Sequence, residues 1–215
     1  MSSLTYAEIK ACFEMSEDAF RKRFAGDKCL MESVIATIAN SPNDNGWPLA
    51  MLGALQPQFA SALKHWSAGG YEEIRHAQES DNVMVGTSAH NMETHFPLLP
   101  HWRGEATHVS NDSGWFSRLE CGTLELRSFM GCCAPGYTFA YVSEPTAVLK
   151  FSSLQTARLI GALTTENLEH EVLLPKGATF RVVSVHKEIK TICLSECSLP
   201  NPSFHRTCAK SRAGR

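Results

Sequence analysis

The sequence lacks a surplus of charge of either sign and lacks any long apolar run. Its 215 residues include 20 Lys and Arg against 22 Asp and Glu, which gives a formal net charge of −2. Nucleic-acid backbones and anionic membranes attract a basic surplus, so this balance favours neither as a partner. No apolar run approaches the ~20 residues of a membrane-spanning helix, and the first residues lack the pattern of a secretory signal. We therefore expect a protein of the cytoplasm, either that of the producing cell or that of a host.

The 8 cysteines are expected to be thiols. In a reducing cytoplasm, disulfide frameworks are rare and free or functional cysteines are the rule. Cys193, Cys197, His205 and Cys208 lie close together in the chain, but their spacing is not that of the common zinc fingers and knuckles. We therefore expect no metal site. The sequence leaves the oligomeric state open.

Helical patterning up to Ser80 gives way to strand patterning. Thr5 and Glu8 have the spacing of a capping box, and one helix is predicted from Pro48 to Trp66, ended by Gly69-Gly70. Turn residues at short intervals then predict strands at Trp102 and its neighbours, 124–130, 146–151, 158–162, 170–174, 179–186 and 191–194. The turn at 174–177 predicts that the strands on either side of it pair as a hairpin. A helical N-terminal layer on a mostly antiparallel sheet is an α+β architecture.

Two short motifs in the strand-rich part carry charged side chains suited to chemistry. Glu169 and Glu171 open an apolar strand, and an extended backbone points both carboxylates to the same side. Arg103 stands between Trp102 and Gly104, where a guanidinium offers a two-pronged donor and a glycine allows close approach, as a diphosphate requires. Each motif alone also fits a role without function. The two glutamates could lie on a solvated strand edge, and Arg103 could be a surface arginine before a turn.

Taken in order, these motifs resemble the arginine-serine-glutamate class of mono-ADP-ribosyltransferases. Trp102-Arg103-Gly104 is similar to the family's aromatic-Arg-Gly strand, and the run from Glu169 to Val182, EHEVLLPKGATFRV, is similar to its Glu-x-Glu strand. Tyr71 to Arg75 resembles the helix that precedes the arginine strand. The similarity covers about residues 66 to 186. Within this class, the chain most resembles the phage Alt/Mod-type enzymes and the small bacterial effectors. It implies a β-sandwich core at 66–198, with a helical segment at 1–65 packed on it and a tail at 199–215.

One element departs from the family pattern. The strand that carries Ser-Thr-Ser in the family is best matched by Ser128 to Cys133, so Gly131 stands where the family has its first serine. In the family that hydroxyl orients the catalytic glutamate, and here Cys132 and Cys133 would offer only weakly donating thiols. Ser128, Ser143 and Ser152-Ser153 are the other serines near this region.

The resemblance implies a set of roles. Arg103 would anchor the diphosphate of NAD, with Gly104, Gly131, Cys132 and Cys133 lining the cofactor site. Glu171 would bind the ribose and stabilise an oxocarbenium-like state as the nicotinamide bond breaks. Glu169 would orient an arginine guanidinium of the target protein and accept its proton.

We therefore expect an NAD-dependent enzyme that transfers ADP-ribose to arginine side chains of target proteins. The missing serine at position 131 keeps an alternative open, a non-catalytic module of the same fold that binds an arginine-containing protein segment. A third interpretation, an NAD glycohydrolase that transfers to water, is disfavoured by Glu169, which the family uses for an arginine acceptor.

Overall fold

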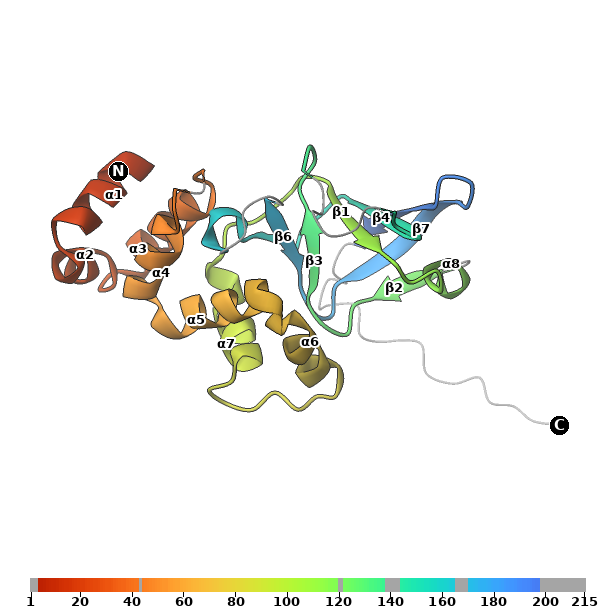
Figure 1. The fold of residues 1–215 in the computed structure, drawn as a ribbon, viewed down its shortest axis with the longest axis horizontal. Coiled ribbons are helices and arrows are strands. Elements are labelled where there is room, and N and C mark those ends of the chain that lie inside the picture. Colours follow the sequence, from red (N-terminus) through yellow and green to blue (C-terminus); the bar gives the residue numbers. More distant parts are fainter. Residues whose placement is uncertain (1–3, 43, 120–121, 138–143, 165–169, 198–215) are drawn as a thin grey trace, which may run out of the picture.

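The computed structural model describes residues 4–42, 44–119, 122–137, 144–164 and 170–197. Helices occupy the N-terminal half and strands the C-terminal half, and Figure 1 shows α1 to α4 at one end of the molecule and the sheet at the other. The helices are α1 (Tyr6–Met15), α2 (Glu17–Phe24), α3 (Lys28–Ala39), α4 (Trp47–Leu55), α5 (Pro57–His65), α6 (Tyr71–Glu79), α7 (Ser88–His95) and α8 (Trp115–Arg118), with short turns η1 (Trp66–Gly70), η2 (Phe96–Leu98) and η3 (Gly161–Leu163).

The beginning of α1 confirms the predicted capping box. The Glu8 amide donates to the Thr5 hydroxyl at 3.3 Å, and the Glu8 carboxylate accepts from the Thr5 amide at 2.8 Å. The single helix predicted from Pro48 to Trp66 is wrong, because Gln56 leaves the helical region with φ −141° and ψ 73°. The ring of Pro57 disfavours a helical conformation for the residue before it. The segment therefore forms two helices, α4 and α5.

The chain turns sharply between α5 and α6, at the Gly69-Gly70 pair. Gly69 has φ +96°, and Ala68 and Gly69 leave the helical region, so the segment Trp66–Gly70 is a kink between the two helices. A Cβ on Gly70 would lie 1.8 Å from Cδ2 of the His65 ring, so a side chain at this position would require the ring to move. The predicted break is confirmed, and the chain continues from it into α6, which lies near α7 below β3 in Figure 1.

The strands form one sheet in the order β2-β7-β8-β4-β1-β3-β6-β5. Their bounds are β1 (Ala106–Ser110), β2 (Thr123–Glu125), β3 (Met130–Cys133), β4 (Ala147–Ser152), β5 (Arg158–Leu159), β6 (Glu171–Leu174), β7 (Thr179–His186) and β8 (Thr191–Glu196). The described pairs are antiparallel except β4 with β8. The predicted α+β class with a mostly antiparallel sheet is confirmed.

Strands β1 and β3 pair over a much shorter stretch than β1 and β4. All five residues of β1 pair with β4, whereas Thr107 with Cys133 is the one β1–β3 pair in the described register. Where this ladder opens, the Nδ1 atom of His108 lies 2.8 Å from the Gly131 carbonyl oxygen. A side chain thus satisfies a carbonyl that a longer strand pair would have satisfied with a backbone amide.

The turn forms one residue later than predicted, at 175–178 instead of 174–177, and the predicted hairpin is wrong. The Ala178 amide donates to the Pro175 carbonyl at 3.2 Å, yet β6 pairs with β3 and β5 while β7 pairs with β2 and β8. The Gly177 amide instead donates to the Leu126 carbonyl at 2.7 Å. Turn residues specify a local reversal of the chain and do not select the partner of each strand.

Two hydrophobic clusters meet at β6. Leu173 packs with Phe129, Ile160 and the helices, whereas Val172 and Leu174 pack with the sheet residues on the other face. This follows from the alternation of side chains along a strand. The helical layer therefore covers the face of β3 and β6 that also carries Glu171.

Some boundaries differ from the predicted ones. Trp102 lies next to an isolated bridge between His101 and Arg158, and β1 begins only at Ala106. The strand predicted at 158–162 ends at Leu159 and is followed by η3, while α7 and α8 lie in stretches after Ser80 for which no helix or strand was predicted. Within the described residues, none of the helices combines the length and apolar character needed to span a membrane.

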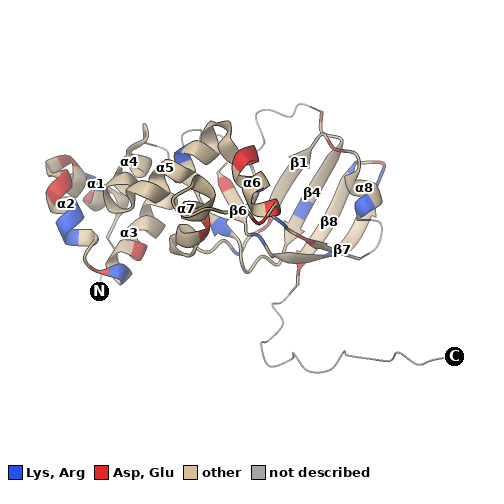
Figure 2. Cartoon of the chain, turned by 90° about the horizontal axis from the view of Figure 1, so that it is seen from below, with Lys and Arg blue, Asp and Glu red and all other residues tan. Residues whose placement is uncertain are grey.

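Charges of both signs are intermixed on the helices. Figure 2 shows acidic and basic colours side by side on α2, where Arg21 and Glu17 form an ion pair of 2.7 Å. This mixture agrees with the near-zero net charge.

Candidate functional site

The strand pair β3–β6 brings Glu171 next to Gly131. Gly131 pairs with Leu173 and Cys133 pairs with Glu171, so Gly131 and Glu171 are diagonal neighbours on one face. A Cβ built on Gly131 would lie 2.5 Å from the Glu171 Oε1 atom. The carboxylate therefore occupies the space that a side chain at position 131 would need.

The indole of Trp66 donates a hydrogen bond to this carboxylate. The Trp66 Nε1 atom lies 2.9 Å from Glu171 Oε1. The indole is held edge-on by Tyr71 and Phe129, with ring centroids 6.2 and 6.3 Å away, and is only 4% exposed. The site expected from the sequence does not include Trp66. Its position directly before the Ser-Ala-Gly-Gly segment does not by itself indicate a contact with a carboxylate.

The loop that carries Arg103 is anchored near the start of β6. The Trp102 indole packs edge-on to His170 with centroids 6.2 Å apart, and its N–H donates to the Glu105 carbonyl at 3.0 Å. A Cβ on Gly104 would lie 2.9 Å from the Trp102 ring, so this glycine permits the tight loop. Arg103 is exposed, and no described residue forms a hydrogen bond or ion pair with its guanidinium, which is available to an anion.

Cys132 and Cys133 lie on the same strand but face opposite sides. Both are buried, with Cys132 in the sheet cluster and Cys133 opposite Glu171 in the register. Burial raises the pKa of the Cys132 thiol well above its usual value, and the nearby charge of Glu171 and the Cys133 thiol add to this shift. Cys132 is therefore a neutral packing residue of the strand.

A second layer of polar contacts ties α6 to β3. The Ser128 hydroxyl donates to Glu79 at 2.9 Å and accepts from the Arg75 Nε atom at 3.3 Å. This serine is thus engaged with the helix.

Burial lowers the pKa of His108, and the positive charge of Arg75 contributes to the same shift. His108 is accordingly a neutral ring that donates from Nδ1 to Gly131.

His170 has an unusual backbone conformation, with φ +41°. Its ring stacks on Tyr137 with centroids 5.0 Å apart, and its carbonyl accepts from the Ala134 amide at 3.3 Å. Burial lowers the pKa of this ring as well. These contacts fix the residue directly before Glu171. Glu169 itself lies outside the described residues, as does Ser143.

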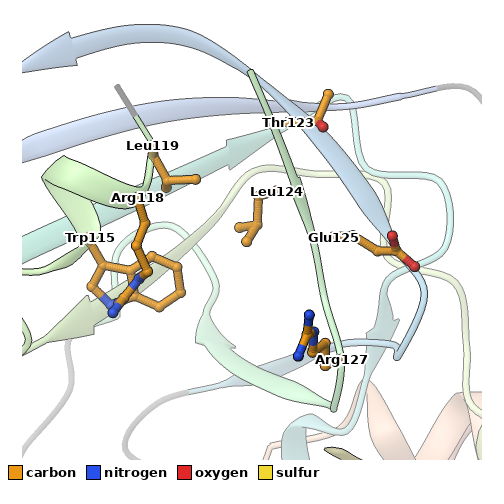
Figure 3. Close-up of a pocket in the computed structure, with 7 residues that line it drawn as sticks. All are labelled: Trp115, Arg118, Leu119, Thr123, Leu124, Glu125 and Arg127. Atoms are coloured by element: carbon orange, nitrogen blue, oxygen red, sulfur yellow. The ribbon is translucent and has the colours of Figure 1, made fainter. Parts of the chain in front are cut away.

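A separate pocket of about 500 Å³ lies between α8 and β2. Figure 3 shows Trp115 and Arg118 on one side and Glu125 and Arg127 on the other. Arg118 is engaged with Asp112 at 2.6 Å and covers the Trp115 ring. Since β2 and β6 lie toward opposite ends of the strand order, this pocket is distinct from the surroundings of Glu171. Among the described residues, which exclude His205 and Cys208, no cluster of three or more metal-ligating side chains is found.

Comparisons with known proteins identify the fold. No protein-family model matches the chain, and no curated protein matches it either. Among solved structures, the type III effector XopAI from Xanthomonas axonopodis pv. citri superposes with a TM-score of 0.53 at 15% identity, covering 92% of this chain and 96% of the effector. An ADP-ribosyltransferase from Clostridium botulinum gives a TM-score of 0.51 at 11% identity over 67% of this chain and 87% of its own.

Exoenzyme S from Pseudomonas aeruginosa, solved in complex with human 14-3-3 protein beta and bound to carba-NAD, gives a TM-score of 0.52 at 14% identity. It covers 69% of this chain and 78% of its own. Identities this low establish similarity of architecture. The chain therefore has the ADP-ribosyltransferase fold.

Proposed function

We propose that the protein is an NAD-dependent mono-ADP-ribosyltransferase that modifies arginine side chains of target proteins. The observation that carries the proposal is the Glu171 carboxylate, which is held over Gly131 by the Trp66 N–H at the start of β6. In the neighbouring fold, Exoenzyme S binds the NAD analogue carba-NAD, which supports NAD as the substrate of this site.

The two charged residues of the site fit two parts of NAD, its diphosphate and the ribose that carries nicotinamide. Arg103 presents an exposed guanidinium on an anchored loop and would hold the diphosphate of NAD. Glu171 has a fixed carboxylate, which stabilises positive charge that develops on the ribose as the nicotinamide bond breaks. Gly104, Gly131 and Cys133 would line the cofactor site, as the resemblance implies, whereas Cys132, which the resemblance also includes, faces the other side of the sheet.

The assignment of arginine as the acceptor rests on Glu169. A guanidinium is hard to deprotonate, and a second carboxylate two residues before Glu171 would orient it and accept its proton. The same resemblance assigns the arginine-serine-glutamate class, a helical segment at 1–65, a catalytic core at 66–198 and a tail at 199–215. The similarity to a type III effector supports action inside a host cell.

The test compares Glu171→Gln with the matched variant Glu188→Gln, whose glutamate is exposed between β7 and β8. Each protein is incubated with adenylate-labelled NAD, a mixed protein extract and, separately, a small guanidine acceptor such as agmatine. We expect Glu171→Gln to lower nicotinamide release by ~100-fold or more, with Glu188→Gln at the wild-type rate.

Two outcomes would contradict the proposal in different ways. Absence of both nicotinamide release and label transfer by the wild-type protein refutes the enzyme. Nicotinamide release without labelling of agmatine or of protein arginine refutes the acceptor and indicates water or another side chain. Calorimetry with NAD then examines the binding-module alternative, which predicts no NAD affinity that depends on Arg103. We expect Arg103→Gln to weaken NAD binding.

A further inference from the structure

Position 131 has no side chain, yet the neighbouring carboxylate is held in a fixed place. We propose that Trp66 is a positioning residue for Glu171, whose indole N–H performs the orienting role of a hydroxyl at position 131. This inference rests on the proposed function, in which Glu171 is the catalytic carboxylate. Trp66 acts through Glu171 and is not itself a catalytic residue.

The hydrogen bond is well suited to fix a carboxylate. An indole has a single N–H, and that of Trp66 is directed to Glu171 Oε1 at 2.9 Å. Because the tryptophan is only 4% exposed, water cannot easily replace the acceptor, and an unpaired buried donor is costly. A hydrogen bond to a charged acceptor is also stronger than one between neutral groups.

The glycine and the tryptophan form a matched pair. The Cβ position on Gly131 lies 2.5 Å from Glu171 Oε1 and 3.6 Å from Cζ2 of Trp66. The indole and the carboxylate therefore share the space above Gly131. A serine at this position would displace the carboxylate from the indole, so the absent hydroxyl and the present N–H are two parts of one arrangement.

The backbone around Trp66 fixes the direction of the N–H. Trp66 is the first residue of the kinked segment between α5 and α6, in which Ala68 and Gly69 leave the helical region. At the other end of α6, the buried Gln78 accepts from the Phe129 amide at 2.9 Å, and its backbone carbonyl accepts from Lys176 at 2.8 Å. Phe129 directly precedes β3, so the helix that follows Trp66 is tied to the strand of Gly131.

Trp66→Phe removes the N–H and keeps most of the aromatic packing. We expect NAD affinity, measured by calorimetry, to stay within about two-fold, because the substitution leaves Arg103 untouched. We expect the turnover of nicotinamide release to fall by about 10- to 100-fold, the effect of losing one hydrogen bond to a charged group. The acidic limb of the pH profile should move to higher pH, because the carboxylate loses a stabilising donor.

The matched control is Trp115→Phe. Trp115 lies on α8, where its N–H donates to Ser110 at 3.1 Å, so this variant also loses one indole hydrogen bond but not one to Glu171. We expect wild-type turnover and an unchanged pH profile. A Trp66→Phe protein with wild-type turnover and pH profile would overturn the proposal, and so would one that loses NAD affinity and turnover in equal measure.

A second measurement does not depend on activity. In the NMR spectrum of the wild-type protein, the Trp66 indole proton should shift with pH as Glu171 titrates, and the shift should vanish in Glu171→Gln. The NMR measurement tests the proposal even if Trp66→Phe fails to fold. An indole resonance without pH dependence overturns the proposal. If the wild-type protein releases no nicotinamide, the proposed function fails, while the resonance still reports whether Trp66 holds the carboxylate.

Discussion

Replacement of Gly131 by alanine should separate the carboxylate from its donor. The added Cβ would lie 2.5 Å from Glu171 Oε1, whereas carbon in contact with another heavy atom settles at about 3.5 Å. The oxygen must therefore retreat by about 1 Å, and the 2.9 Å hydrogen bond to Trp66 is then lost. Gly131 is not among the described glycines with positive φ, so the strand itself accepts alanine.

The magnitude follows from the bond that is lost. A hydrogen bond to a charged group contributes about 1.5–3 kcal/mol, which corresponds to roughly 10- to 100-fold in turnover if the bond is needed in the transition state. The assay is nicotinamide release at saturating NAD, with urea denaturation to confirm folding.

The double variant with Trp66→Phe sharpens this test. Since both substitutions break the same contact, their effects on turnover should not add, and the double variant should resemble the single ones. Wild-type turnover in Gly131→Ala, or fully additive losses in the double variant, would refute the reasoning.

Two further predictions concern stability. Glu196 is 6% exposed, and its carboxylate accepts from the amides of Gln155 and Thr156 and from the Thr156 hydroxyl. Glu196→Gln should therefore lower the free energy of unfolding by about 1–3 kcal/mol. An unchanged urea midpoint would show that these hydrogen bonds are not needed to hold residues 155–156 in place. Because burial lowers the pKa of His108, the unfolded chain binds its proton first, and stability should be lost as pH falls below about 6.5. His108→Asn, which keeps a donor toward Gly131, should reduce the loss of urea stability between pH 7 and pH 5, and an equally steep decline in the variant would argue against this role.

Local chemistry makes several elements predictable. Thr5 and Glu8 specify a cap within four residues of each other, and the alternation of apolar residues in β7 and β8 specifies strands whose bounds agree closely with the prediction. A reversal of the chain near 174–177 is equally visible in the sequence, although the hydrogen-bonded turn lies at 175–178. The pairing of its two strands with each other is nevertheless a wrong prediction, because pairing partners depend on contacts between residues far apart in the chain.

The candidate site is predictable only in part. Glu171 and Gly131 both stand out through their flanking residues, and the pairing of β3 with β6 places them together. Trp66 does not stand out. Nothing in its sequence neighbourhood indicates that its N–H meets a carboxylate 105 residues away, since an apolar residue at a helix end is ordinarily a packing residue.

The hydrogen bond between Trp66 and Glu171 also has a consequence for folding. Pairing of β3 with β6 alone places the carboxylate beside Gly131, but its donor arrives only when the helical layer docks on that face of the sheet. This contact spans 105 residues, so it closes a longer loop than the pairing of β3 with β6, and the entropic cost of closing a loop grows slowly with its length. The carboxylate should therefore acquire its contact with Trp66 only once the helical layer has docked on the sheet, which couples the geometry of this site to the packing of the two parts of the chain.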